Sequence, residues 1–174
     1  MLIKKIEEAG YNSAMFGLSL NKNQPINKMH EVALKLSGMD LGHNKFLESI
    51  QTWWSVTAPR YWWQDADTYR ISSKQSESTN HTILSHSLTT NNFEYGDITE
   101  SYLAELNYLI EIKDFLKLKR KLPEGFLQMR EWHMSYKTLR NIIKQRYNHI
   151  LPYWKNFCEE VFQQVDHPEF LPKL

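Results

Sequence analysis

The chain has 174 residues, which is close to the size of one ordinary domain of about 100–150 residues. Hydrophobic residues make up 41% and charged residues 24% of it, a balance that is typical of a globular protein and excludes a disordered one. The 21 Lys and Arg residues nearly balance the 20 Asp and Glu residues, so the net charge of +1 argues against a surface built to bind DNA or RNA.

Hydrophobic periodicity and turn residues predict a mixed set of elements in the first half of the chain. Residues 1–7 alternate loosely, and they fit a first strand or a frayed helix. The run Ile50–Val56 is rich in β-branched and aromatic residues, which indicates a strand. Helices are predicted over Glu8–Leu20, over Lys28–Leu36 with Asn27 as its cap and Gly38 at its end, over Asn44–Ser49 and over Ala58–Arg70, whereas Asn21–Asn27, Ile71–Leu88 and Thr89–Gly96 are predicted as loops, the second with short strands.

The second half of the chain is predicted to be mainly helical. Its clearest helix begins at a cap supplied by Asp97 or Thr99 and runs to about Leu118, with a continuous apolar stripe. Leu122-Pro123 ends this region, and further helices are predicted over Phe126–His149 and Trp154–Val165. We therefore expect one α/β-type domain with an excess of helix over residues 1–174.

Several kinds of chemistry are excluded by the residue types and their spacing. Cys158 is the only cysteine, which excludes an intrachain disulfide and fits a reducing compartment. It is followed by Glu159 and Glu160, which would raise the pKa of the thiol, so we interpret it as a buried structural residue. The seven histidines form no zinc-hydrolase motif, and the six glycines form no dinucleotide or P-loop motif, so no metal site is expected.

Two polar regions have both a structural and a functional interpretation. Residues 60–81 gather Arg60, Arg70, Lys74 and many hydroxyl groups, a composition that suits either a solvated loop or a phosphate cradle. On residues 135–146, Lys137, Arg140 and Lys144 lie near one helix face, which is most simply a solvated surface. The sequence also lacks a signal-peptide core and a run of about 18 apolar residues, so we expect a cytoplasmic protein with no membrane partner.

Two blocks of the sequence resemble the flavin-dependent thymidylate synthases. In Val56–Asn80, Ala58-Pro59, an aromatic stretch and Arg70 resemble the family segment A-P-x-F-x-x-x-Q-x-x-R-H-R, and the following ISSKQSEST resembles its continuation S-x-N-E-x-S. In the second block, Leu122-Pro123, Trp132, Leu139, Asn141 and Arg146 fall at the spacings of the family's L-P…W…N-x-x-x-x-R run. Together the blocks cover about a third of the chain.

The resemblance implies a fold and an activity. The fold is of the α+β kind, with a central, mainly antiparallel sheet and long flanking helices. Members of the family methylate dUMP at C5 with FAD, methylene-tetrahydrofolate and NADPH, and their active site is built between the subunits of a homotetramer. We therefore expect a protein similar to a pyrimidine-nucleotide C5 methyltransferase, with FAD and a dUMP-like nucleotide as ligands and no nucleic acid polymer as partner.

The resemblance also assigns candidate site residues, position by position. Arg146 is expected to contact and polarise the pyrimidine, and Ser78 is expected to lie beside its C5 atom. These two residues are the catalytic candidates and, with Lys119 and Gln64, the substrate-binding candidates. The candidates for binding the cofactor are Arg70, Ser73, Gln75 and Asn141, of which Asn141 matches a helix asparagine that faces the flavin.

The sequence departs from the family pattern at three places, and the chain is shorter than typical members, as a divergent, phage-like one would be. The R-H-R motif reads Thr68-Tyr69-Arg70, Gln75 replaces an asparagine, and Asn80 replaces an arginine. Each lost charge-assisted contact weakens phosphate binding by about 1.5–3 kcal/mol unless another cation replaces it. Because a fold does not fix a function, the alternative is a non-catalytic oligomer that binds or sequesters a nucleotide on the same scaffold.

Overall fold

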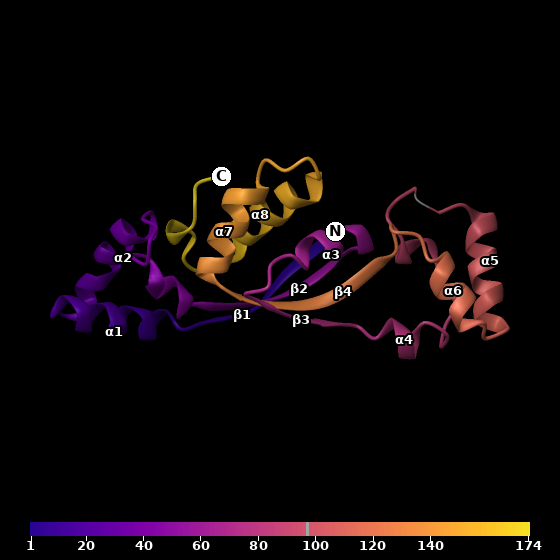
Figure 1. Cartoon of the computed structure of the whole chain (residues 1–174), viewed down its shortest axis with the longest axis horizontal. Coiled ribbons are helices and arrows are strands. Elements are labelled where there is room, and N and C mark those ends of the chain that lie inside the picture. Colours follow the sequence, from indigo (N-terminus) through magenta and orange to yellow (C-terminus); the bar gives the residue numbers. More distant parts are fainter. Residues whose placement is uncertain (97) are drawn as a thin grey trace. The chain divides into compact units, whose positions relative to one another are not determined.

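The computed structural model describes residues 1–96 and 98–174 (Figure 1). Over these residues the chain is α+β, with eight α-helices and a four-stranded antiparallel sheet in the order β1-β2-β4-β3, as the resemblance implied. None of the helices in this part of the chain has the length and apolarity that a membrane crossing requires. The strands are β1 (Leu2–Ala9), β2 (Gln51–Pro59), β3 (Ser73–Ser76) and β4 (Leu127–Ser135), and the α-helices are α1 (Tyr11–Lys22), α2 (Met29–Ser37), α3 (Arg60–Ala66), α4 (Thr79–Thr82), α5 (Glu100–Glu111), α6 (Phe115–Lys121), α7 (Tyr136–Arg146) and α8 (Pro152–Gln164).

The elements of the first half agree well with the sequence prediction. The first segment is the strand β1 rather than a frayed helix, and α1 begins only after Gly10. Gly10 has a φ of 96°, and a Cβ atom there would lie 2.0 Å from the Ser49 carbonyl oxygen, so this turn requires glycine. The short helix predicted at Asn44–Ser49 is a 3-10 helix, η2 (Lys45–Glu48), and three further 3-10 turns are η1 (Ile26–Lys28), η3 (Thr90–Asn92) and η4 (Pro168–Phe170).

The helix predicted over Phe126–His149 is wrong for its first third, which is the strand β4. Its leucine, glutamine, methionine and arginine residues are good helix formers, but Trp132 and Met134 are buried while the residues between and beside them are half-buried. Strand β4 pairs with both β2 and β3 in the interior of the sheet. Tertiary pairing therefore overrides local propensity over these nine residues.

The single helix predicted up to Leu118 is two helices, α5 and α6. Between them Lys113 adopts a positive φ of 57°, and the Asp114 side chain accepts a hydrogen bond from the backbone N–H of Lys117 at the start of α6. Thr99 caps α5 by accepting a hydrogen bond from the Tyr102 N–H at 3.3 Å. The alternative cap, Asp97, lies outside the described residues.

Backbone contacts divide the chain into two compact units, each with its own packed interior, and the expectation of a single domain stays a prediction. Unit 1 comprises Met1 and residues 57–68 and 75–130, and unit 2 comprises residues 2–56, 69–74 and 131–174. One hydrophobic cluster of unit 1 is aliphatic and phenylalanine-rich, around Leu106, Leu109 and Phe126. In unit 2 the rings of Trp132 and Trp154 both pack against Phe157, and α7 lies beside α8 (Figure 1).

Cys158 is fully buried on α8, as the sequence predicted. Burial, with a smaller contribution from the charge of Glu159, raises the pKa of its thiol to about 12. We therefore expect iodoacetamide at about pH 8 to leave the native thiol unmodified and to alkylate it once urea unfolds the protein. Mass spectrometry of both samples measures this, and rapid labelling of the native protein would contradict the assignment.

Candidate functional site

A pocket of about 500 Å³ in unit 2 brings together residues from four parts of the sequence. This volume lies in the range of about 300–1,000 Å³ that is typical of small-molecule sites. The pocket is lined by two of the four cofactor-binding candidates, Ser73 and Asn141, which come from different sequence blocks. Its lining consists of Glu48, Gln51, Ile71, Ser72, Ser73, His133, Met134, Ser135, Lys137, Thr138 and Asn141.

The wall of the pocket is built where β4 turns into α7. Ser135 ends the strand and caps the helix, because its hydroxyl accepts a hydrogen bond from the Thr138 N–H at 3.3 Å. The Thr138 hydroxyl in turn donates to the Ile71 carbonyl at 3.0 Å, which ties the segment before β3 to the first turn of α7. The first turn of α7 therefore fixes the position of the segment that carries Ser73.

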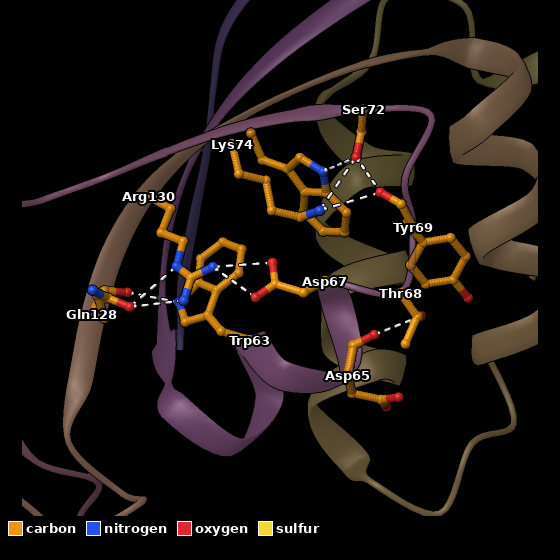
Figure 2. A network of polar contacts seen from close by, with 10 residues as sticks. Trp63, Asp65, Asp67, Thr68, Tyr69, Ser72, Lys74, Gln128 and Arg130 are labelled. Carbon is orange, nitrogen blue, oxygen red and sulfur yellow. Dashed lines mark hydrogen bonds and ion pairs between the residues drawn. The ribbon is translucent and has the colours of Figure 1, made fainter.

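A second network of polar contacts holds the same segment, residues 69–74, in place (Figure 2). The Ser72 hydroxyl donates to the Tyr69 carbonyl at 2.6 Å and accepts from the Trp132 indole N–H at 2.9 Å. Lys74 donates to both of these oxygens at 3.3 Å, and its ammonium lies 4.9 Å from the centre of the Trp132 ring. The Lys74 ammonium is thus already engaged by contacts within the protein. It is therefore a poor replacement for the phosphate-binding cations that the altered R-H-R motif lacks.

The charges around this pocket are of both signs. Lys137 forms an ion pair with Glu48 at 3.2 Å, so its charge is already partly balanced. Arg70 is exposed and, among the contacts of residues 1–96 and 98–174, it has no ion pair. Arg70 directly precedes the pocket-lining residue Ile71 in the sequence, but it is not itself part of the lining.

Arg146, the principal catalytic candidate, does not line this pocket. It ends α7, where its Nε donates to the Tyr69 hydroxyl at 2.8 Å and its Nη1 lies 2.8 Å from the His149 ring nitrogen. The guanidinium also lies 5.0 Å from the centre of the Trp154 ring and 5.6 Å from that of Tyr69. Because Asn141 and Arg146 are five residues apart on one helix, they project from different sides of it.

The basic face of α7 is not a simple solvated surface, contrary to the sequence interpretation. Arg140 is buried, donates to the Gly38 carbonyl at 3.2 Å, and has the pKa of its guanidinium lowered by burial. Lys144 pairs with Asp40 at 3.3 Å. This face packs against the segment between α2 and β2, which the sequence pattern of α7 alone does not reveal.

In unit 1, the residues beside the altered R-H-R motif serve local structure. The Arg130 guanidinium pairs with Asp67 at 3.1 Å, donates to the Gln128 side chain, and lies 4.6 Å from the centre of the Trp63 ring (Figure 2). The Thr68 hydroxyl donates to the Asp65 carbonyl at 2.8 Å at the end of α3. Thr68 thus ends a helix and offers no positive charge where the family pattern has arginine.

Unit 1 also gathers the remaining substrate-binding candidates. The Lys119 ammonium donates to the Thr79 hydroxyl at 2.9 Å, and burial together with the nearby charge of Arg60 lowers its pKa. Arg60 and Gln64 both contact Glu124, at 3.7 Å and 3.0 Å. The neighbouring Ser78 is exposed at the start of α4, where its carbonyl accepts from the Thr82 N–H and hydroxyl, and Gln75 is exposed on β3.

Several lining residues were not selected as site candidates from the sequence, and of these His133 lies in a segment that was wrongly predicted as helix. Gln51 and His133 lie on neighbouring strands, and Lys137 lies one turn before Asn141 on α7. The alternation of large apolar residues with His133 was the available signal for a strand. Among the described residues, no three His, Cys, Asp or Glu side chains are arranged to hold a metal ion.

The fold has close counterparts among solved structures. Two crystal structures of the flavin-dependent thymidylate synthase of Helicobacter pylori, each with FAD and dUMP, superpose on the chain with TM-scores of 0.83. The first is 14% identical and covers 98% of both chains, and the second is 15% identical and covers 98% of this chain and 97% of the other. No protein-family model and no curated protein matches the sequence. The chain therefore has the fold of the flavin-dependent thymidylate synthases, and the resemblance seen in its two sequence blocks is confirmed at the level of the fold.

Proposed function

We propose that the chain binds FAD and a pyrimidine nucleotide of the dUMP type, and that it transfers a one-carbon group to C5 of the pyrimidine. The observation that carries this proposal is the pocket that joins Ser73 and Asn141. Two sequence blocks assigned these residues to the cofactor independently of the structure. Support comes also from the solved structures with the same fold, which hold FAD and dUMP.

The pocket suits the flavin ring in size and in chemistry. Ser73, Ser135 and Asn141 offer hydroxyl and amide groups for the polar edge of a ring, and Met134 and Ile71 offer apolar contacts. Arg70 supplies positive charge for the pyrophosphate. Bound FAD supplies the hydride or one-carbon transfer capacity that no side chain of this protein has, with methylene-tetrahydrofolate as the carbon donor and NADPH as the reductant.

The nucleotide is assigned to the residues that the sequence blocks selected. Lys119 and the nearby Arg60 offer positive charge to a phosphate, and a bound anion would offset the effects of burial and of the Arg60 charge, which lower the pKa of Lys119. Gln64 and Ser78 add an amide and a hydroxyl group. The role of Arg146, which belongs to unit 2, is carried over from the sequence resemblance alone: it would withdraw electrons from the pyrimidine and so favour attack at C5.

A second candidate function is nucleotide binding without catalysis. The observation that favours it is the set of contacts that already engage Arg146, from Tyr69, His149 and Trp154. In this arrangement Tyr69, which replaces the histidine of the R-H-R motif, accepts a hydrogen bond from the Nε edge of the Arg146 guanidinium. Under this function the protein sequesters the nucleotide, and no group is transferred to the pyrimidine.

We propose in addition that the protein is a cytoplasmic homotetramer. Large apolar side chains are exposed in the single chain, among them Leu2, Ile6, Leu20, Ile71, Leu116 and Ile150. Association of subunits would remove such side chains from water, which is a favourable contribution to most protein–protein interfaces. Gel filtration with light scattering tests this, and a monomeric mass would contradict it.

Flavin retention is the direct test of the proposed function. We expect purified protein that has been mixed with FAD and gel-filtered to keep absorbance bands near ~375 and ~450 nm, at about one flavin per subunit. Ser73→Ala and Asn141→Ala should each lower this occupancy, whereas Ser85→Ala, an exposed serine in unit 1, should leave it unchanged. Tritium release from labelled dUMP then separates the two functions. Flavin without tritium release supports the binding function, and no flavin retention contradicts the proposal.

A further inference from the structure

We propose that His133 is a positioning residue that couples flavin binding in the unit 2 pocket to pH, because its protonation reverses the direction in which the Ser73 hydroxyl donates. The inference rests on the proposed function for the identity of the ligand. Neither of the two sequence blocks assigned a role to His133. Three contacts of its imidazole ring, with residues on β2 and β3, support this role.

The first two contacts determine where the ring hydrogen lies. The Nε2 atom of His133 is 2.9 Å from the Gln51 side-chain oxygen, which can only accept a hydrogen bond. The neutral ring therefore carries its hydrogen on Nε2. Its Nδ1 atom, 3.3 Å from the Ser73 hydroxyl oxygen, is then an acceptor, so Ser73 donates its proton to His133.

Protonation of the ring changes this arrangement. The imidazolium has hydrogen atoms on both nitrogens, so Nδ1 donates to the Ser73 oxygen, and the serine proton is released to point elsewhere. Toward the pocket, Ser73 thus offers a lone pair when His133 is neutral and a proton when His133 is charged. The change needs no movement of the backbone, because the same two heavy atoms form the hydrogen bond in both states.

The third contact keeps the ring in place through both states. The Trp53 ring stacks on His133 with the ring centres 4.6 Å apart and an interplanar angle of 21°. An aromatic face stabilises a cation that lies against it. The charged groups that line the pocket with His133 are Glu48 on η2 and Lys137 on α7, and they are paired with each other. Glu131 lies two residues before His133, on the same face of β4.

The chemistry of the ligand sets the direction of the effect. The polar edge of an isoalloxazine ring has acceptors at N1, O2, O4 and N5 but only one donor, the N3–H group. A serine that is free to donate therefore matches this edge better than one that only accepts. We expect flavin binding to tighten when His133 becomes protonated at acid pH.

The first readout needs no ligand. Nitrogen NMR of the full-length protein, with its histidines labelled with ¹⁵N, should find the neutral His133 ring protonated on Nε2. The Ser73→Ala variant should change the ¹⁵N chemical shift of Nδ1 in this ring and leave that of His86, which forms a similar hydrogen bond with Ser85 at 2.8 Å, unchanged. A neutral ring protonated on Nδ1, or an Nδ1 chemical shift that Ser73→Ala does not change, would overturn the inference.

The second readout is flavin affinity, measured by fluorescence between about pH 5.5 and about pH 8.5 with FAD and with riboflavin. Riboflavin carries no charge, so its binding reports the hydrogen bond rather than the general electrostatic attraction. For the wild type we expect riboflavin to bind about tenfold tighter at the acid end, the worth of one hydrogen bond gained. His133→Gln and Ser73→Ala should each lose this pH dependence, and the matched control His86→Gln should keep it.

The two readouts separate failure of the inference from failure of the proposed function. If flavin binds and His133→Gln keeps the pH dependence of the wild type, His133 does not couple binding to pH and the inference fails, while the proposed function stands. If no flavin binds at any pH, the proposed function fails. The ring tautomer and the effect of Ser73→Ala on the Nδ1 chemical shift of His133 then decide whether the chain of hydrogen bonds from Gln51 through His133 to Ser73 exists.

Discussion

Replacing Arg146 with alanine is expected to weaken dUMP binding about 100-fold, the worth of a charge-assisted contact with the pyrimidine. The same change should lower the free energy of unfolding by about 2 kcal/mol, because it removes the hydrogen bond to Tyr69 and the contact with the Trp154 ring. Isothermal titration with dUMP and urea unfolding measure the two effects separately.

Two matched variants distinguish a binding role from a structural one. Arg146→Lys keeps the positive charge and should retain part of the contact with Trp154, but it cannot repeat the planar set of hydrogen bonds. Lys144→Ala removes a positive charge two residues away on α7 and should leave dUMP affinity within about twofold, since its contact is an exposed pair with Asp40. Unchanged dUMP affinity in Arg146→Ala would show that the assignment of the pyrimidine contact is wrong.

Replacing Trp132 with alanine is expected to lower the free energy of unfolding by about 3–5 kcal/mol, the usual cost of emptying a buried aromatic site. The indole is fully buried, packs against Phe157 at a ring-centre distance of 5.3 Å and donates to Ser72. Urea unfolding monitored by circular dichroism measures this loss. A loss below about 1 kcal/mol would contradict the view that Trp132 anchors the interior of unit 2.

Trp132→Phe separates packing from the hydrogen bond. The smaller ring retains most of the contact with Phe157 but leaves the Ser72 hydroxyl without the indole donor, so we expect a smaller loss of about 1–2 kcal/mol. Because Ser72 directly precedes Ser73, the same variant should also reduce flavin occupancy. Retention of full occupancy would show that the segment 69–74 is held by its other contacts.

Much of the fold could be predicted from the sequence because it is recorded in local patterns. The apolar periodicity of α2 and α8, the Thr99 cap and the β-branched run of β2 all depend on residues that are close together in the chain. The break between α5 and α6 was missed, since it depends on a positive φ at Lys113, a residue type that gives no turn signal. The segment of β4 was also mispredicted, since its residues favour a helix in isolation.

The residues of the candidate site likewise include some that the sequence pointed to and others that only tertiary contacts reveal. The resemblance of each sequence block to the family motifs selected Ser73 and Asn141, and the structure brings both to one pocket. Nothing in either block selected Gln51 or His133, because these residues meet only through the pairing of β2 with β4. Nor did the basic pattern of α7 reveal that Arg140 is buried, which depends on the packing of this helix against Gly38.

Most of the helices could be predicted from short spacings along the chain, whereas the α+β fold with its antiparallel sheet and the candidate site residues were implied by the resemblance of two sequence blocks to a known family. The tertiary structure alone decided which polar groups share the unit 2 pocket and which cations remain available to a ligand. Arg70 remains exposed, while Lys74, Lys137 and Arg146 are engaged by neighbours that are mostly distant in the sequence. The physical reason is that hydrogen bonds, ion pairs and ring contacts form between residues that folding brings together, and their partners are not written in local periodicity.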